Sequence, residues 1–126
     1  MRTAARPHGE LRGRQNDPSL LIMLSLAEGD KHGHALVGDI EAMAGVRLGP
    51  GTLYGAISRL EERGLIEPLA QEGRRRPYRL TGAGLAALAE AVEELRRLAD
   101  AGERRLASAT RRLRAPGFAL APRWTP

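Results

Sequence analysis

A glycine–proline–glycine turn at residues 49–51 constrains the fold of this chain more than any other feature. A helix does not readily run through this turn from its N-terminal side. A new helix can open there, because Pro50 presets φ for a first turn and the Thr52 hydroxyl can cap one. Apolar residues then recur at helical spacing until Gly64, which ends the helix. The residues expected to face the core are Leu53, Ala56, Ile57 and Leu60.

The opposite face of this helix carries only small and polar residues. At ~100° per residue, Gly51, Gly55 and Ser58 fall on that face. Arg59 lies beside them and Tyr54 on the flank. Because large apolar side chains are missing there, this face can lie close against another surface.

Residues 65–80 predict a β-hairpin directly after the helix. Leu65-Ile66 begins an extended segment, Glu72-Gly73 makes a turn, and residues 77–80 return as the second strand. The tip carries three consecutive arginines, Arg74, Arg75 and Arg76. A helix with a bare polar face followed by such a hairpin is typical of a winged helix-turn-helix. We therefore predict a mainly α fold with a small β-hairpin.

The first helix of the domain is predicted to start at Asp17-Pro18, with the aspartate as cap and the proline in the first helical position. It is apolar almost all round and stops at Gly29-Asp30. Such a helix is either central in its domain or shared with a second subunit. Its apolar residues are Leu20, Leu21, Ile22, Leu24 and Leu26.

A second helix is expected over residues 34–44, with inward-facing Leu36, Ile40 and Met43. The segment 46–48 should then form a third strand beside the hairpin. His32 and His34 precede this helix as a pair without a third ligand nearby. A structural or capping role is therefore favoured over a metal site.

A last, long helix is predicted over residues 82–114, where apolar residues follow an a/d heptad. The seam comprises Leu85, Leu88, Val92, Leu95, Ala99, Leu106 and Leu113, with Gly102 and Ala109 at the d positions between them. Nothing in a small domain can cover a seam of this length, so we predict packing against a second copy in a two-fold symmetric dimer. The alternative is a monomer in which this helix folds back on the first helix.

The runs GTLYGAISRLEERGLIE and RRRPYRLT resemble the PadR family of bacterial transcriptional regulators. In that family the recognition helix starts Gly-Thr-Leu-Tyr, and a basic wing precedes a Tyr-Arg-Leu-Thr strand. The resemblance covers roughly residues 17–110. It implies a winged helix-turn-helix DNA-binding domain over residues 17–81 and a dimerising helix over residues 82–114, as in the short form of the family. It also implies a repressor.

Some PadR-like dimers bind aromatic or multidrug ligands between their subunits, through aromatic side chains of the C-terminal helix. Residues 82–114 contain no Trp, Tyr or Phe, so this mode does not carry over. Binding of a small-molecule effector beside the first helix stays open, and no residue indicates a particular compound.

Double-stranded DNA is the predicted partner, because the reading helix of this class enters the major groove with its N-terminal residues nearest the bases. The predicted contacts on that helix are Thr52, Tyr54, Gly55, Ser58 and Arg59. Thr52 and Tyr54 would meet phosphates, and Arg59 guanine or phosphate. The alternative for Tyr54 is a half-buried structural residue. The wing arginines Arg74, Arg75 and Arg76 should follow the phosphate backbone or minor groove, giving affinity and salt dependence.

The distribution of charge supports a polyanionic partner. The net charge is +5 over the chain, yet residues 17–70 carry four basic and eight acidic side chains. The hairpin has four arginines against Glu72. Residues 1–16, a predicted disordered arm, and residues 115–126, a predicted flexible tail, are basic too. Basic extensions on an acidic body would touch DNA while repulsion elsewhere fixes the orientation.

Composition and motifs exclude several other classes. A chain of 126 residues without cysteine has no disulfide, thiolate metal site or catalytic thiol. No apolar run nears the ~18 residues of a membrane span, so we expect a cytoplasmic protein. No Gly-x-Ser-x-Gly or Gly-Lys-Ser/Thr motif occurs, and we expect neither enzyme activity nor a cofactor. Two rival functions are a winged helix used for protein contact and a basic nucleic-acid binder without sequence preference.

Overall fold

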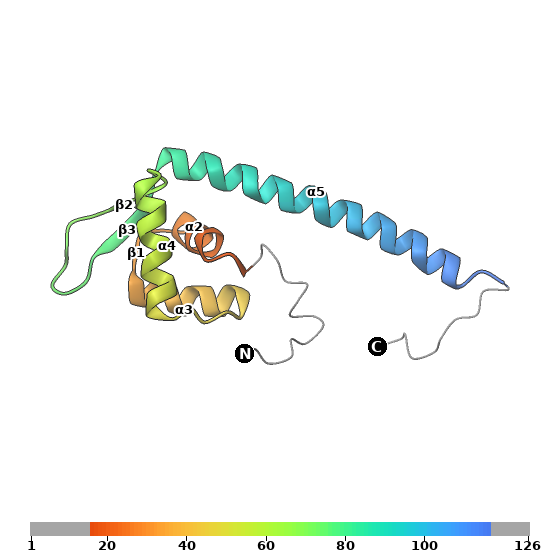
Figure 1. Cartoon of the computed structure of the whole chain (residues 1–126), viewed down its shortest axis with the longest axis horizontal. Helices are drawn as coiled ribbons and strands as arrows, with labels where there is room; N and C mark the ends of the chain where they lie inside the picture. Colours follow the sequence, from red (N-terminus) through yellow and green to blue (C-terminus); the bar gives the residue numbers. More distant parts are fainter. Residues whose placement is uncertain (1–15, 117–126) are drawn as a thin grey trace. The chain divides into compact units, whose positions relative to one another are not determined.

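The computed structural model describes residues 16–116, which form four helices and a three-stranded antiparallel sheet (Figure 1). The helices are α2 (Pro18–Ala27), α3 (Gly33–Ala44), α4 (Pro50–Glu62) and α5 (Gly82–Leu113). The strands are β1 (Lys31–His32), β2 (Ile66–Pro68) and β3 (Pro77–Leu80). The predicted mainly helical winged helix-turn-helix is confirmed. Apart from residues 16, 115 and 116, the predicted arm and tail lie outside the described residues.

Helix α2 is the centre of the core. The Asp17 carboxylate accepts a hydrogen bond of 3.0 Å from the Ser19 N–H, and Pro18 takes the first helical position, as predicted. The buried apolar residues of α2 are Leu20, Leu21, Ile22, Met23 and Leu26. Because α2 contacts α3, α4 and β3, its apolar surface is covered on several sides within one chain. This agrees with the first of the two predicted alternatives, a helix that is central in its domain.

One polar side chain, Ser25, is buried in α2 and links three elements. Its hydroxyl donates a 2.5 Å hydrogen bond to the Asp39 carboxylate of α3. Its backbone carbonyl accepts a hydrogen bond from the Lys31 ammonium of β1. Since a buried hydroxyl without a partner costs free energy, these bonds fix α3 and β1 relative to α2.

Helix α3 packs through Leu36 and Ile40, which are fully buried. The prediction that Met43 also faces inward is wrong, because its side chain is 46% exposed. The spacing is helical, but residues 41–43 of the last turn are all exposed. The apolar stripe of α3 therefore reaches beyond the part of the helix that the core covers.

The sheet has the order β1-β3-β2. Strand β1 pairs Lys31 with Tyr78 and His32 with Pro77, and β2 pairs Ile66 with Leu80. The prediction of a third strand at residues 46–48 is therefore wrong. That segment follows Gly45, which ends α3 with a positive φ, and it buries Leu48 as a connection to α4.

Helix α5 begins at a tightly packed joint with the sheet. The Thr81 hydroxyl accepts a 3.0 Å hydrogen bond from the Gly84 N–H and donates one of 2.7 Å to the Gly64 carbonyl. A Cβ on Gly84 would overlap the carbonyl oxygen of Leu65. Only glycine thus lets the first turn of α5 lie against this backbone.

The structure divides into two units after Glu90, within α5. Leu88 is buried in the first unit, whereas Leu85 is 59% exposed. In the second unit Leu98 and Leu106 are 71% and 68% exposed. Within residues 16–116, none of the helices combines the length and the apolar character that a membrane crossing needs.

Candidate nucleic-acid interface

The exposed face of α4 is the first part of the candidate interface. Its inner face is buried as predicted, at Leu53, Ala56, Ile57 and Leu60. Of the predicted DNA contacts on this helix, Gly55 is half-buried and the exposed ones are Thr52, Tyr54, Ser58 and Arg59. The Arg59 guanidinium lies over Gly55, where a Cβ would be 3.6 Å from its Nη1 atom. The outer face thus consists mainly of small and polar residues, with the Arg59 side chain lying along it.

The N-terminus of α4 is open to solvent. Pro50 opens the helix and Gly49 is its N-cap, without a side-chain hydrogen bond. Thr52 lies exposed within the first turn and does not cap it. The first N–H groups of a helix lack intrahelical acceptors and attract anions. This end of α4 therefore has the donors that a phosphate requires.

Tyr54 joins α4 to the start of α3. Its side chain is 49% exposed, and a Cβ on Gly33 would overlap its hydroxyl. Both interpretations of Tyr54 therefore agree with its position: one side packs against the chain, and the other faces solvent. The glycine of His32-Gly33 leaves the space that the phenol occupies.

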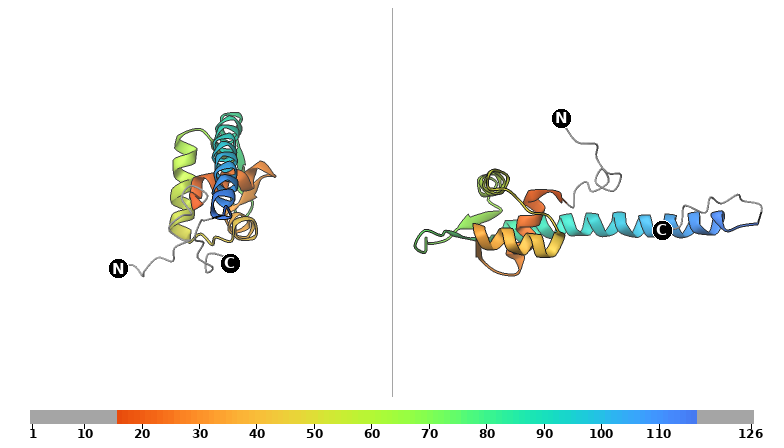
Figure 2. Two further views of the ribbon diagram at one scale, coloured as in Figure 1. Left: turned by 90° about the vertical axis from the view of Figure 1, so that its right-hand side faces the viewer. Right: turned by 90° about the horizontal axis from the view of Figure 1, so that it is seen from below.

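The wing is the loop of residues 69–76 that joins β2 to β3, and a tight turn lies at its tip. Figures 1 and 2 show it extending past α2, α3 and α4. Across the turn, Glu72 and Arg75 exchange two backbone hydrogen bonds of 2.7 and 2.9 Å. Gly73 has a φ of +63°, which L side chains rarely adopt. The arginines are therefore carried on a defined turn.

The wing arginines differ in their contacts. Arg76 donates to the Leu69 carbonyl at 2.7 Å and to the Gln71 side chain at 3.2 Å, which ties the two sides of the wing together. The Arg75 Nη1 atom lies 3.5 Å from His32 Nε2. Arg74 is exposed in the turn itself. Arg75 and Arg74 are therefore better placed than Arg76 to bind a partner.

The remaining hairpin arginine, Arg79, is paired with a carboxylate. Its Nε and Nη2 atoms donate to the Glu67 carboxylate at 3.0 and 2.7 Å on the outer side of the sheet. This hydrogen-bonded partner raises the pKa of Arg79. The basic charge of the hairpin is thus partly neutralised at this position and concentrated towards the tip.

Residues of the wing and of α4 line one hollow of about 370 Å³. It is lined by His32, Gly33, His34, Tyr54, Gln71, Arg74, Arg75, Arg76 and Tyr78. The pKa of Tyr78 is raised, mainly by burial and secondly by the negative charge of nearby Glu61, so its phenol stays neutral. Four predicted contacts meet here, namely Tyr54 and the three wing arginines. The other four do not line the hollow, and these are Thr52, Gly55, Ser58 and Arg59.

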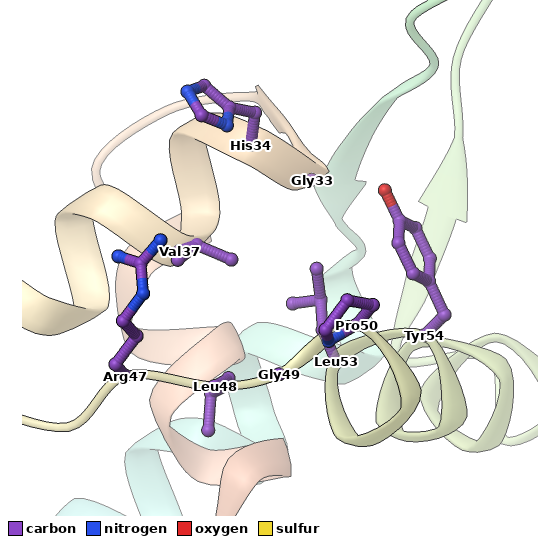
Figure 3. A pocket seen from close by; sticks show the side chains of 9 residues that line it. All are labelled: Gly33, His34, Val37, Arg47, Leu48, Gly49, Pro50, Leu53 and Tyr54. Carbon is purple, nitrogen blue, oxygen red and sulfur yellow. The ribbon is translucent and has the colours of Figure 1, made fainter.

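A second cavity, of about 510 Å³, opens on the other side of Tyr54, between the N-terminal ends of α3 and α4 (Figure 3). Its apolar lining consists of Val37, Leu48, Pro50 and Leu53. Arg47 also lines it, and its guanidinium is held by the Glu41 carboxylate at 2.9 Å. In the described part of the chain, no three His, Cys, Asp or Glu side chains come together as metal ligands.

Comparison with known proteins decides the family. The sequence model of the transcriptional regulator PadR-like family matches residues 22–90, which include α4, the wing and both hollows. This chain is a member of the PadR-like family. The members of this family are transcriptional regulators.

Two curated relatives are similar to this PadR-like regulator. An uncharacterised 37.1 kDa protein in transposon Tn4556 of Streptomyces fradiae is 46% identical over 85 residues, which are 68% of this chain and 25% of that protein. The chain thus spans a quarter of the length of this relative. The transcriptional regulator Rv3488 of Mycobacterium tuberculosis is 44% identical over 84 residues, covering 62% of this chain and 78% of that protein.

Solved structures share the fold. A PadR family transcriptional regulator from Eggerthella lenta superposes with a TM-score of 0.65 and 30% identity, over 79% of this chain and 90% of that one. A transcriptional regulator from Clostridium thermocellum gives a TM-score of 0.63 at 24% identity, over 81% and 97%. At 24% identity, the match to the Clostridium thermocellum protein shows a shared fold alone.

Sequence reasoning missed part of this regulator's candidate interface. It placed Tyr54 and the wing arginines in the site, but it gave His32 and His34 only a structural or capping role. His32 does cap α3, through a 3.4 Å hydrogen bond from the Ala35 N–H to Nδ1. The antiparallel pairing of β1 with β3, which the sequence did not indicate, brings the same ring next to Arg75.

Proposed function

We propose that this PadR-like regulator binds duplex DNA sequence-specifically, with α4 in the major groove and the wing on the adjacent backbone. The observation that carries the proposal is the hollow in which Tyr54 meets Arg74, Arg75 and Arg76 beside the exposed face of α4. Thr52, Ser58 and Arg59 would read or position the bases, since N-terminal residues of such a helix reach base edges. The wing would supply affinity with little sequence choice.

The DNA-binding form is a homodimer whose seam runs along α5. Leu85 and Leu106 of this seam expose most of their side chains, and a second copy of the helix would remove this apolar surface from water. A two-fold dimer presents two copies of α4 to a palindromic operator, with half-sites about one helical turn apart. The dimerisation residues we propose are Leu85, Leu88, Val92, Leu95 and Leu106, of which Leu88 is already buried within its own chain.

Repression, with release by a small-molecule effector, completes the proposal. Repression is proposed from the family resemblance and not from a particular residue. Two hollows offer space for an effector: the cavity beside Pro50 and Tyr54, and one of about 340 Å³ beside the end of α2, lined in part by Leu26 and Leu85. An effector in the first would contact the reading helix directly.

A fluorescence-anisotropy titration tests the DNA-binding proposal. The probe is duplex DNA from upstream of the protein's own coding region, with scrambled duplex as control, at two salt concentrations. Tight binding to the first and ~10³-fold weaker binding to the second is the expected result. Equal, steeply salt-dependent binding to both would favour a non-specific nucleic-acid binder. No binding at low salt would favour a winged helix that contacts proteins.

Tyr54 gives a residue-level test. Tyr54→Phe should weaken operator binding if the hydroxyl meets a phosphate, by about tenfold for a hydrogen bond to a charged group. Tyr54→Ala should weaken binding further, because the ring packed against Gly33 is lost as well. Unfolding of both variants by urea should resemble the wild type, because the ring is half exposed. Unchanged affinity in both variants would remove Tyr54 from the interface.

A further inference from the structure

His32 has one ring nitrogen committed to the fold. As the N-cap of α3, its Nδ1 atom accepts the Ala35 N–H at 3.4 Å. A nitrogen that accepts a hydrogen bond carries no proton, and a neutral imidazole holds its single proton on the other nitrogen. The cap therefore makes Nε2 of His32 a donor.

The nearest group to that donor is another donor. Nε2 of His32 lies 3.5 Å from Nη1 of Arg75, and a guanidinium has no acceptor. Two N–H groups that face each other across the gap between β1 and the wing cannot satisfy one another. A single oxygen atom placed between them, accepting from both, would satisfy the pair.

The surroundings specify the charge of that oxygen. The pair lines the hollow of about 370 Å³, whose lining contains three arginines and no carboxylate. Arg76 directs N–H groups to Leu69 and Gln71 within the wing, so Arg74 and Arg75 supply the free donors, while all three arginines contribute positive charge. Tyr54 and Tyr78 add their hydroxyl groups to the same lining. An oxyanion has the charge and the acceptors that this set of donors requires.

We propose that His32 and Arg75 form a binding site for a single phosphate of the DNA backbone. The Nε2–H of His32 and the Nη1–H of Arg75 donate to the same phosphate, beside the hydroxyl of Tyr54. The inference rests on the proposed DNA binding and adds His32 as a contact residue. It links the N-terminus of α3 to the wing, so that one phosphate positions both elements on the duplex.

His32→Asn is the informative variant, because asparagine is a good N-cap yet is too short to place a donor beside Arg75. The stability of the protein to urea should stay the same, while operator affinity falls by about tenfold, as for a lost hydrogen bond to a charged group. The salt dependence should not change, because Arg74, Arg75 and Arg76 all remain in place. Unchanged operator affinity in a fully folded His32→Asn variant would overturn the inference.

Arg75→Ala and the double variant test whether both residues share one phosphate. Arg75→Ala should lower the slope of log affinity against log salt by about 1 per subunit. If both groups hold the same phosphate, the double variant should lose less affinity than the product of the single losses. Fully additive losses would assign the two residues to separate contacts. Arg79→Ala is the matched control, because Arg79 is paired with Glu67 and does not line the hollow.

Neutral backbone substitutions identify the phosphate itself. Replacing each operator phosphate in turn by methylphosphonate should reveal one position per half-site where wild type loses about tenfold, His32→Asn loses less because Arg75 remains, and the double variant loses nothing further. If every substitution weakens wild type and variant equally, no phosphate is held by His32. This result would overturn the inference while leaving sequence-specific binding intact.

A titration with inorganic phosphate, followed by the NMR signals of the His32 ring, separates the two proposals. A shift of these signals, absent with chloride at equal ionic strength, is expected from an oxyanion site. A shift without DNA binding would mean that the site binds phosphate and that the proposed DNA-binding function is wrong. Absence of the shift together with an unaltered His32→Asn affinity would refute the site.

Discussion

The two units of this protein differ in where their apolar side chains lie. Residues 16–90 bury a core around α2, with Ile22, Leu36 and Ile40 fully inaccessible to water. Residues 91–116 have no buried side chain among them, and Leu98 and Leu106 are 71% and 68% exposed. The first unit thus has its own source of stability, and the second does not.

The difference shows what each unit requires. Most of the stability of a protein helix comes from packing one face, and a single helix in water gains little from propensity alone. The second unit therefore depends on a surface supplied from outside the chain, which in our proposal is its own copy. The predictions below test this contrast, from the largest expected effect to the smallest.

Leu95→Glu should have the largest effect. A carboxylate placed in an apolar seam loses its hydration, so the dimer should dissociate and sediment as monomers. Operator affinity should fall by about 10³-fold, because two linked half-sites become two separate binding events. Urea unfolding of the first unit should change little. Leu95→Met, which conserves volume, is the control, and a Leu95→Glu protein that stays dimeric would refute the seam.

Gly84→Ala should destabilise the first unit by about 3 kcal/mol, since an added methyl group must displace the Leu65 backbone and overpacking of this kind is costly. The loss should appear as a lower urea midpoint with an unchanged slope. A midpoint equal to that of wild type would mean that α5 can begin without this close contact.

Alanine at both Arg74 and Arg75 should lower the salt slope of operator binding by about 2 per subunit, one for each phosphate contact. The protein should unfold as wild type does, because neither side chain holds the wing together. Arg76→Ala is the contrasting variant: it should loosen the wing by removing the bonds to Leu69 and Gln71. A slope that does not change in the double variant would exclude the wing tip from DNA.

Gly102→Ala should have the smallest effect and the opposite sign from Gly84→Ala. A Cβ at Gly102 meets nothing within 4 Å, and alanine in a helix interior is favoured over glycine by about 1 kcal/mol. The helical content of α5 in circular dichroism should survive to a higher temperature. A loss of stability instead would show that the seam approaches too closely at Gly102 to admit a methyl group.

Most elements could be predicted from the sequence because each has a local signal. Asp17-Pro18 marks the start of α2, the Gly49-Pro50-Gly51 turn marks α4, and the heptad marks α5. Strand β1 has no such signal, because two residues are too few to show alternation. The third strand was therefore assigned to residues 46–48, whose sequence looks extended but pairs with no strand in the described chain.

The candidate site could be predicted only in part for the same reason. Tyr54 and the wing arginines stand out within short motifs. The proximity of His32 and Arg75, 43 residues apart, depends on the pairing of β1 with β3. The contact of Tyr54 with Gly33 depends on how α4 crosses α3. Such long-range contacts follow from tertiary packing, which no local pattern contains.

The Thr81 hydroxyl connects the end of α4 directly to the start of α5. It is bonded on one side to Gly64, which follows α4, and on the other to Gly84 in the first turn of α5. A rotation of that first turn must break one of these bonds or carry the end of the reading helix with it. A movement of the first turn of α5 therefore reaches the end of α4 through one oxygen atom. In the dimer that we propose, such a movement would change the spacing of the two copies of α4 while each copy keeps its own conformation.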